Sequence, residues 1–268
     1  MPSPLAHATL AEAKDFLGLT TQDYDGILDA CLDRASAWVD RYCGRVFVSQ
    51  RHYEVKEGGG ERLVLRHQPV SAVYFVGTST DVFLTVTSTT ASDIAATVSA
   101  FDGKLALRRM DSVGTATATD LALDTYPTTA LLAAQVNLTA GFAATVGVSA
   151  PSRYLARAAG RDCKASGAQL LGYSAVSDWQ LDEERGIVYG KSLDRWRSVM
   201  VDYQGGYTTI PPDVVHATLS MCANFFRDRT RDSAVASESL GGYSYSIKSG
   251  EDMSREIDGL LGPYRRIR

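Results

Sequence analysis

The apolar positions near the start of the chain predict two amphipathic helices. The first spans 9–18, where a Thr-x-x-Glu capping box marks the start and a glycine marks the end. In the second, apolar residues recur in steps of three and four, which predicts a helix with one continuous apolar face. This face consists of Tyr24, Ile27, Leu28, Cys31, Leu32, Ala35, Trp38, Val39 and Tyr42. We expect Thr20 with Asp23 to cap its start and Gly44 to end it.

After Arg45 the spacing of apolar residues changes to two, which is typical of strands. Alternation over 46–55 and an apolar run over 63–65 flank Gly58-Gly59-Gly60, so we predict a β-hairpin with a glycine-rich tip. Triple glycines also occur in phosphate-binding loops, but no Gly-Lys-Ser/Thr opens a helix here. A further strand is predicted over 70–76.

The composition then changes sharply. Residues 77–150 contain 15 threonines, only 9 charged residues and no glutamate. Alternation of threonine with apolar residues suits half-buried strands. One helix is predicted behind Pro127, from Thr128 to about Val136. We interpret residues 77–166 as a small β-rich module inserted into the main chain.

The earlier pattern resumes near Ala168. Short strands are predicted over 169–176, 179–181, 186–189 and 198–203. A third helix opens at the Pro-Pro-Asp of 211–213, since proline favours the first turn and aspartate the positive end of the helix dipole. Residues 232–250 are polar and predict an exposed loop or arm. The final segment has apolar residues at helical spacing and ends in a short basic tail.

Composition and charge exclude several classes of protein. Lys plus Arg number 27 against 31 for Asp plus Glu, a net charge of −4, whereas a nucleic-acid binder normally shows a basic excess. No window holds 18 consecutive apolar residues, so no transmembrane helix is expected. No secretory signal is recognisable at the N-terminus. The four cysteines form no Cys-x-x-Cys pair and are interpreted as small buried apolar residues in a reduced protein.

Catalytic and cofactor motifs are missing from the sequence. No HExxH, zinc-finger, GxSxG, GxGxxG or Gly-Lys-Ser/Thr pattern occurs, so we predict no metal site and no cofactor. Asp182, Glu183 and Glu184 are adjacent carboxylates, which more often form a solvated turn than an acid/base pair. A hydrolase that uses Asp182, Glu183 or His216 is therefore a minor alternative.

These patterns together predict an α+β fold. Residues 1–76 and 167–268 are expected to form a small α-helical bundle with antiparallel β-hairpins and a C-terminal arm. Residues 77–166 are expected to form the inserted β-rich domain.

The order of several segments resembles the head–tail connector family (adaptor or head-completion proteins) of tailed bacteriophages. The resemblance covers roughly residues 8–76 and 168–268 and leaves out the insertion. The segments that carry it are TLAEAKDFLG (9–18), AWVDRYCGR (37–45), a stretch over 63–76 with Arg66, His67, Pro69 and Val70, GIVY (186–189), VDYQGGY (201–207), PPDV (211–214), SESLGGYS (237–244) and LLGPYRR (260–266).

The resemblance implies a structural, non-enzymatic virion protein at the head–tail junction, or neck, assembled in the host cytoplasm. Such proteins form a ring, commonly of twelve subunits, beneath the portal protein. The ring extends the DNA channel, through which double-stranded DNA passes without sequence-specific binding, and offers a docking surface to the stopper or tail-completion protein. No membrane is involved.

The C-terminal arm and tail are the segments most suited to binding the portal or a neighbouring subunit, because tyrosine and arginine are enriched at protein interfaces. The candidate residues are Tyr243, Tyr245, Tyr264, Arg265, Arg266 and Arg268. The alternative for these tails is ordinary disordered surface. An alternative for the whole chain is a tail-associated, β-rich, adhesin-like binding protein, whose inserted module would contact host glycans rather than brace the neck.

Overall fold

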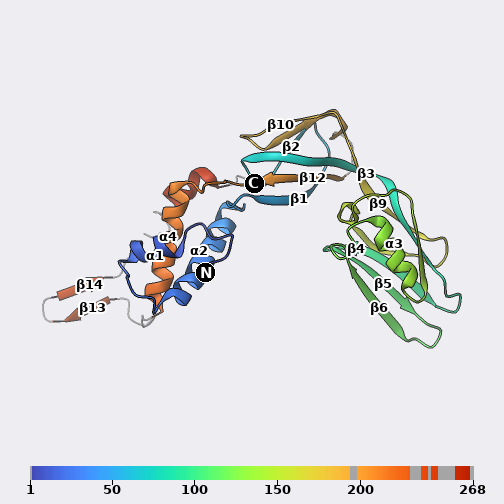
Figure 1. The fold of residues 1–268 in the computed structure, drawn as a ribbon, viewed down its shortest axis with the longest axis horizontal. Helices are drawn as coiled ribbons and strands as arrows, with labels where there is room; N and C mark the ends of the chain where they lie inside the picture. Colours follow the sequence, from blue (N-terminus) through green and yellow to red (C-terminus); the bar gives the residue numbers. More distant parts are fainter. Residues whose placement is uncertain (1, 194–197, 230–236, 241–242, 247–256, 266–268) are drawn as a thin grey trace.

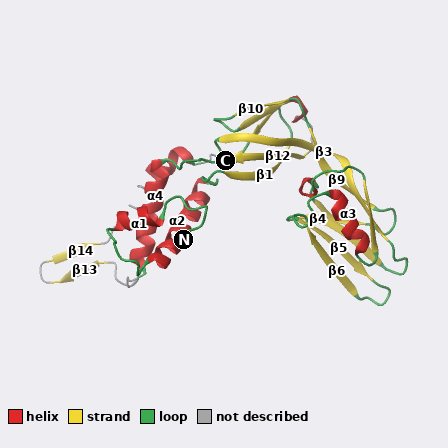
Figure 2. Cartoon of the chain, in the orientation of Figure 1, coloured by secondary structure: helices red, strands yellow, loops and turns green. Residues whose placement is uncertain are grey.

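The fold is α+β, as predicted. The computed structural model describes residues 2–193, 198–229, 237–240, 243–246 and 257–265. Figures 1 and 2 show helices gathered at one end of an elongated chain, sheets in the middle, and a second group of strands with one helix at the other end.

Three helices pack together at the helical end: α1 (Leu10–Leu17), α2 (Asp25–Cys43) and α4 (Pro212–Asp228). Residues 257–261 are also helical and lead into the short η3 (Gly262–Tyr264). Leu28 and Leu32 of α2, Val214 of α4 and Leu261 are buried in one apolar cluster. The predicted apolar face of α2 therefore packs against α4.

Three of the predicted helix termini are confirmed, and one is wrong. Thr9 and Glu12 form both halves of the capping box at α1, and Gly18 and Gly44 end α1 and α2 in the left-handed conformation. The residue before α2 is Tyr24, which makes no side-chain capping bond, so the predicted Thr20–Asp23 cap is wrong. The start of α2 is instead held by an ion pair between Lys14 and Asp25, whose Nζ and Oδ1 atoms are 2.8 Å apart.

The central sheet is built around β12 (Ser198–Gly205), which lies between β1 (Gln50–Glu57) and β3 (Val70–Ser88) in antiparallel register. A three-stranded sheet of β10 (Trp179–Asp182), β11 (Ile187–Gly190) and β2 (Arg62–Val64) is built from the predicted strands nearby. Its Leu63 and Val188 pack with Val199 and Val201 of β12. The turn η2 (Lys191–Leu193) adds Leu193 to the same cluster.

The hairpin predicted around Gly58–Gly60 is wrong in its pairing. β1 pairs with β12, whereas β2 pairs with β11 in the other sheet. The physical reason lies in β12, whose residues 199–203 are all buried. Such a strand needs a neighbouring strand along each edge and cover on both faces, and β1 is the neighbour along one edge.

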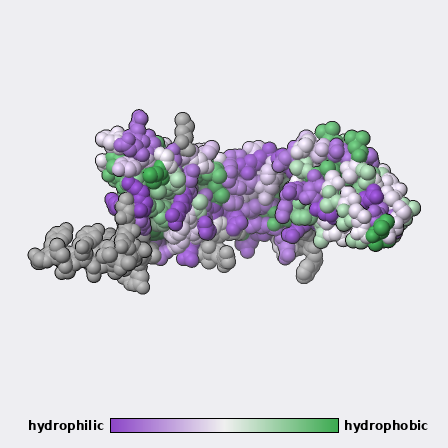
Figure 3. All heavy atoms as spheres, turned by 90° about the horizontal axis from the view of Figure 1, so that it is seen from below, coloured by the Kyte–Doolittle hydropathy of each residue, from purple (hydrophilic) through white to green (hydrophobic). Residues whose placement is uncertain are grey.

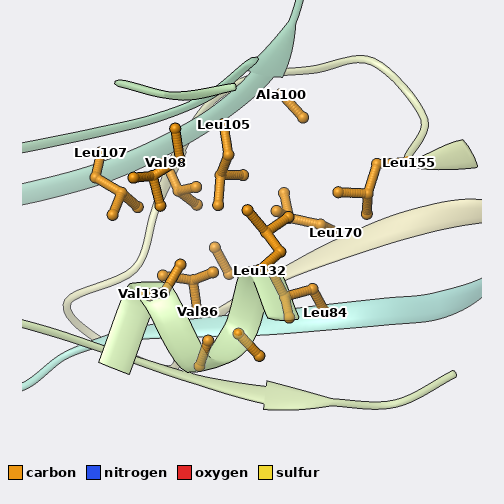
Figure 4. Packing of buried hydrophobic residues seen from close by; sticks show 14 of the residues in the cluster. Leu84, Val86, Val98, Ala100, Leu105, Leu107, Leu132, Val136, Leu155 and Leu170 are labelled. Carbon is orange, nitrogen blue, oxygen red and sulfur yellow. The ribbon is translucent and has the colours of Figure 1, made fainter. Parts of the chain in front are cut away.

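The far end of the chain is a second β-rich unit. Its strands are β4 (Ala95–Phe101), β5 (Lys104–Met110), β6 (Ala116–Ala122), β7 (Phe142–Val146), β8 (Ala158–Asp162) and β9 (Ala168–Ala175). The sheet β6-β5-β4-β8 encloses an apolar core together with β3, β7, β9 and α3 (Thr129–Leu138). Figure 4 shows Leu132 and Val136 of α3 among side chains that come from several strands. The helix predicted from Thr128 is confirmed, with Thr128 as its N-cap.

Strand β3 links the central sheet to this unit. The strand predicted over 70–76 continues without a break to Ser88, first beside β12 and then beside β9 and β7. The proposed domain boundary at residue 77 thus falls inside one strand, and the division into 1–76 with 167–268 and 77–166 stays an interpretation.

Part of the predicted polar arm is a hairpin. β13 (Ser237–Leu240) pairs with β14 (Tyr243–Ser246) in antiparallel register, so the expected loop is wrong for these residues. The rest of 232–250 lies outside the described residues. Among the helices that the structure describes, none is both long and apolar enough to cross a membrane.

The core of the β-rich end gives a direct test of α3. Leu132 has no exposed surface, while its neighbour Leu131 is 52% exposed. We expect Leu132→Ala to lower the free energy of unfolding by about 3 kcal/mol through the lost burial and the cavity left behind. Leu131→Ala is the matched control and should change it by less than about 0.5 kcal/mol. Urea unfolding measures both, and equal effects would contradict this packing.

Candidate assembly interface

The structure describes two of the six predicted contact residues with their side chains. Tyr264 is half-buried and Arg265 is exposed. Tyr243 and Tyr245 lie on β14, and Arg266 and Arg268 lie outside the described residues.

Tyr264 packs against its own chain in an aromatic cluster around Arg45. Its ring meets the ring of buried Phe47 edge-on, with centroids 5.8 Å apart. The Arg45 guanidinium lies 5.1 Å from the Phe47 ring, 5.8 Å from Tyr207 and 5.9 Å from Tyr264, within the range of cation–π attraction. Burial raises the pKa of Tyr264. The cluster ties the C-terminal segment to the junction of α2 and the central sheet.

A buried carboxylate connects three parts of the central sheet. The Asp202 side chain on β12 is completely buried and accepts two hydrogen bonds from Arg51 on β1, at 2.7 Å from Nε and 2.6 Å from Nη2. The Tyr154 hydroxyl, in the turn η1 (Ser152–Tyr154), donates a third bond of 3.0 Å. The hydrogen bonds to Asp202 raise the pKa of Arg51, and burial together with Asp202 raises the pKa of Tyr154 to about 12.

Two tyrosine rings flank the Arg51 guanidinium on the outside of the sheet. Its carbon lies 5.3 Å from the Tyr53 centroid and 4.8 Å from the Tyr74 centroid. The Arg153 guanidinium carbon also lies 5.0 Å from the Tyr53 ring centroid, and Arg153 donates a hydrogen bond to the Tyr53 hydroxyl. We call Arg51, Tyr53, Val55, Tyr74 and Arg153 the tyrosine–arginine patch. Tyr53, Val55 and Tyr74 are exposed.

The opposite face of β1 carries a polar network. Glu54 accepts from the Tyr203 hydroxyl at 2.9 Å and from the backbone amide of Arg66 at 3.0 Å. The rings of His52 and His67 stack nearly parallel with centroids 3.7 Å apart. Burial lowers the pKa of His52, outweighing a backbone bond and the nearby Glu54, which raise it.

Exposed apolar side chains occur at both ends of the molecule, and Figure 3 shows some of them at the surface of the β-rich end. Val113 is 88% exposed, Leu138 is 80% exposed, and Ile94 and Leu131 are also exposed. The middle of the molecule is mainly hydrophilic in the same view.

The residues of the hydrolase alternative lie on separate parts of the chain (Figure 1). His216 is on α4, where its ring meets Phe16 edge-on at 5.8 Å. Asp182 ends β10 and accepts from the Arg185 amide at 3.1 Å, as expected of a turn residue. Within the described residues, no group of three or more His, Cys, Asp or Glu side chains is placed to hold a metal ion.

Sequence reasoning missed the residues around Asp202. One signal was present, because a carboxylate inside the apolar run 198–203 requires a buried cation or donor. Nothing in the sequence identified that partner, since Arg51 is 151 positions away and Tyr154 belongs to the predicted insertion.

Removal of Arg51 tests the role of the buried carboxylate. Arg51→Met leaves Asp202 buried with only the Tyr154 hydroxyl as a donor. We expect the free energy of unfolding to fall by about 3 kcal/mol, because a buried carboxylate is left without its cation. Arg161→Met, an exposed arginine on β8, serves as control and should cost less than about 0.5 kcal/mol in the same urea titration. A result for Arg51→Met as small as the control would contradict this role.

The stacked histidines predict a pH dependence of stability. The pKa of His52 in the folded chain lies below its ordinary value of 6.5, so the unfolded chain binds the proton more readily. This contribution to stability is present above pH 6.5 and is lost as the pH falls through the folded pKa. We expect His52→Gln to flatten the decline of unfolding free energy between about pH 6.5 and pH 5. An unchanged decline would show that other groups cause it.

Comparison with known proteins gives no family. No protein family and no curated protein matches the sequence. Among solved structures, one similar chain belongs to the neck of an empty gene transfer agent particle computed with C6 symmetry. It is 14% identical with a TM-score of 0.48, and the match covers 100% of this chain and 94% of that one. A second, from the virion of a native gene transfer agent particle, is 12% identical with a TM-score of 0.40 and the same coverage. At these values nothing about the function of this chain follows from either similarity.

Proposed function

We propose that the chain is a head–tail adaptor, a non-enzymatic structural protein of a tailed phage or phage-like virion. Several copies, commonly twelve in the family that it resembles, form a ring beneath the portal protein at the neck. The ring extends the DNA channel and carries the stopper or tail-completion protein. Assembly takes place in the host cytoplasm.

The observation that carries the proposal is the meeting of the resembling segments in space. Arg45 ends the segment 37–45, Tyr207 ends 201–207, and Tyr264 lies in 260–266. In the structure the guanidinium of Arg45 contacts the rings of both tyrosines. Segments that are far apart in the sequence, and that carry the resemblance only through their order, therefore form one cluster, as expected if they belong to one architecture.

The hairpin β13–β14 supports the placement of the partner contacts. A two-stranded hairpin is at best marginally stable alone in water, and among the described strands these two pair only with each other. We assign to Tyr243, Tyr245, Arg265, Arg266 and Arg268 the contact with the portal or a neighbouring copy. Tyr264 holds this segment on the helical end.

The net charge suits a conduit for DNA. Twelve copies at −4 each give a ring of about −48. A mildly acidic tube does not retain DNA phosphates, whereas a strongly basic one binds them through counterion release. Double-stranded DNA would pass through without sequence-specific contacts.

A second candidate is a tail-associated binding protein that uses its β-rich end. The exposed Ile94, Val113 and Leu138 favour it, because they give this end apolar side chains that a partner could cover. In the adaptor proposal the same surface braces the ring against capsid or tail proteins.

Substitution of the hairpin tyrosines tests the adaptor proposal. Purified chain is titrated onto DNA-filled, tailless capsids of its own particle, and the portal vertex is imaged by electron cryo-microscopy. We expect Tyr243→Ala/Tyr245→Ala to weaken occupancy of the vertex at least about tenfold, as loss of two interface tyrosines typically does.

Ser239→Ala/Ser244→Ala on the same hairpin is the matched control and should bind as the wild type does. A vertex that stays bare with saturating wild-type chain contradicts the adaptor proposal. Binding of the chain to the tail, through the β-rich end, would favour the second candidate.

A further inference from the structure

The two faces of the central sheet differ in chemistry. Along β12, the side chains of Val199, Val201 and Tyr203 face the three-stranded sheet β10-β11-β2. Met200 and Asp202 face the other way, toward η1 and the tyrosine–arginine patch. The three-stranded sheet and the patch therefore lie on opposite sides of the same layer.

The tyrosine–arginine patch is exposed yet already ordered. Val55 and Tyr74 are each 55% exposed. Arg51 uses only two of its five N–H donors in hydrogen bonds to Asp202, and its guanidinium is held against the rings of Tyr53 and Tyr74. Tyrosine and arginine are enriched among the hot spots of protein interfaces, and side chains held in one conformation lose little entropy on binding. This surface is suited to a partner that presents carboxylates.

Such carboxylates lie at the turn between β10 and β11. Glu183 and Glu184 are exposed. The backbone of the turn is fixed, because the Glu183 carbonyl accepts from the Val70 amide at 3.1 Å and the Gly186 carbonyl accepts from the Leu65 amide at 2.8 Å. We call Asp182, Glu183 and Glu184 the acidic turn.

The acidic turn and the patch lie near the same end of the central sheet. Val70, which holds the turn, pairs with Gly205 of β12, and the neighbouring Gln204 pairs with Arg51 of the patch. Two complementary surfaces on opposite sides of one chain cannot satisfy each other within that chain. A head-to-tail contact between copies would bring them together, and contacts of this type generate a closed ring when the rotation between copies closes.

We propose that the acidic turn of one copy docks on the tyrosine–arginine patch of the next copy. Glu183 and Glu184 then pair with the free donors of Arg51 and with Arg153, in place of its exposed ion pair with Asp124 (3.6 Å), while Tyr53 and Tyr74 contact the turn. The inference rests on the proposed ring and specifies which surfaces form it.

Charge reversal tests this contact in full-length protein. One chain carries Arg153→Glu, so its turn and its patch are both negative, and the other carries Glu183→Arg/Glu184→Arg, so both are positive. Sedimentation velocity over rising concentration measures self-association. We expect each reversed chain alone to associate at least about tenfold more weakly than wild type, because like charges then face each other across the contact. An equimolar mixture should recover association to within about threefold, since each turn meets an opposite patch.

Arg161→Glu and Asp23→Arg reverse exposed charges outside both surfaces and should associate as wild type does. The inference is overturned if wild type stays monomeric up to about 1 mM, since the acidic turn of one copy would then not bind the patch of another. It is equally overturned if a reversed chain associates as wild type does, or if the mixture does not recover.

These outcomes separate the inference from the adaptor role. Reversed chains that still fill the portal vertex as a normal ring would overturn the docking of turn on patch and leave the adaptor role intact. Recovery in the mixture, combined with a vertex that wild type leaves bare, would support the docking and contradict the adaptor role.

Discussion

The structure depends on one buried charge, the carboxylate of Asp202 in the middle of β12. A carboxylate without exposed surface is costly unless donors surround it, and here Arg51 and Tyr154 supply them. Arg51 comes from the edge strand β1 and Tyr154 from η1, beside the β-rich end. A single side chain thus fixes the position of two other segments on the central sheet and orders the tyrosines outside it.

The helices were predictable because their signals are local. The capping box at Thr9 and the glycines at 18 and 44 act within a few residues, and the apolar stripe of α2 repeats over five turns. Strand pairing was not predictable in the same way. The glycines at 58–60 indicated a turn, but the neighbour of β1 was decided by β12, more than 140 residues later, which needs cover on both faces.

The candidate site was likewise predictable only where its signals are local. Composition predicted that the tyrosine- and arginine-rich tails are contact segments, and the structure describes Tyr264 in a cluster with Phe47 and Arg45 of its own chain. The tyrosine–arginine patch had no sequence signal, because its members come from β1, β3 and η1 and converge only through the sheet. Residues that meet across such distances in the chain require the tertiary structure.

The most direct test of the adaptor account is the position of this chain in its own particle. A reconstruction of the intact neck by electron cryo-microscopy, at a resolution that separates strands, can be searched with the structure. The account predicts copies arranged around one axis directly below the portal, with the β13–β14 hairpin in contact with the portal or an adjacent copy. Density for the chain only on the tail, away from that axis, would contradict it.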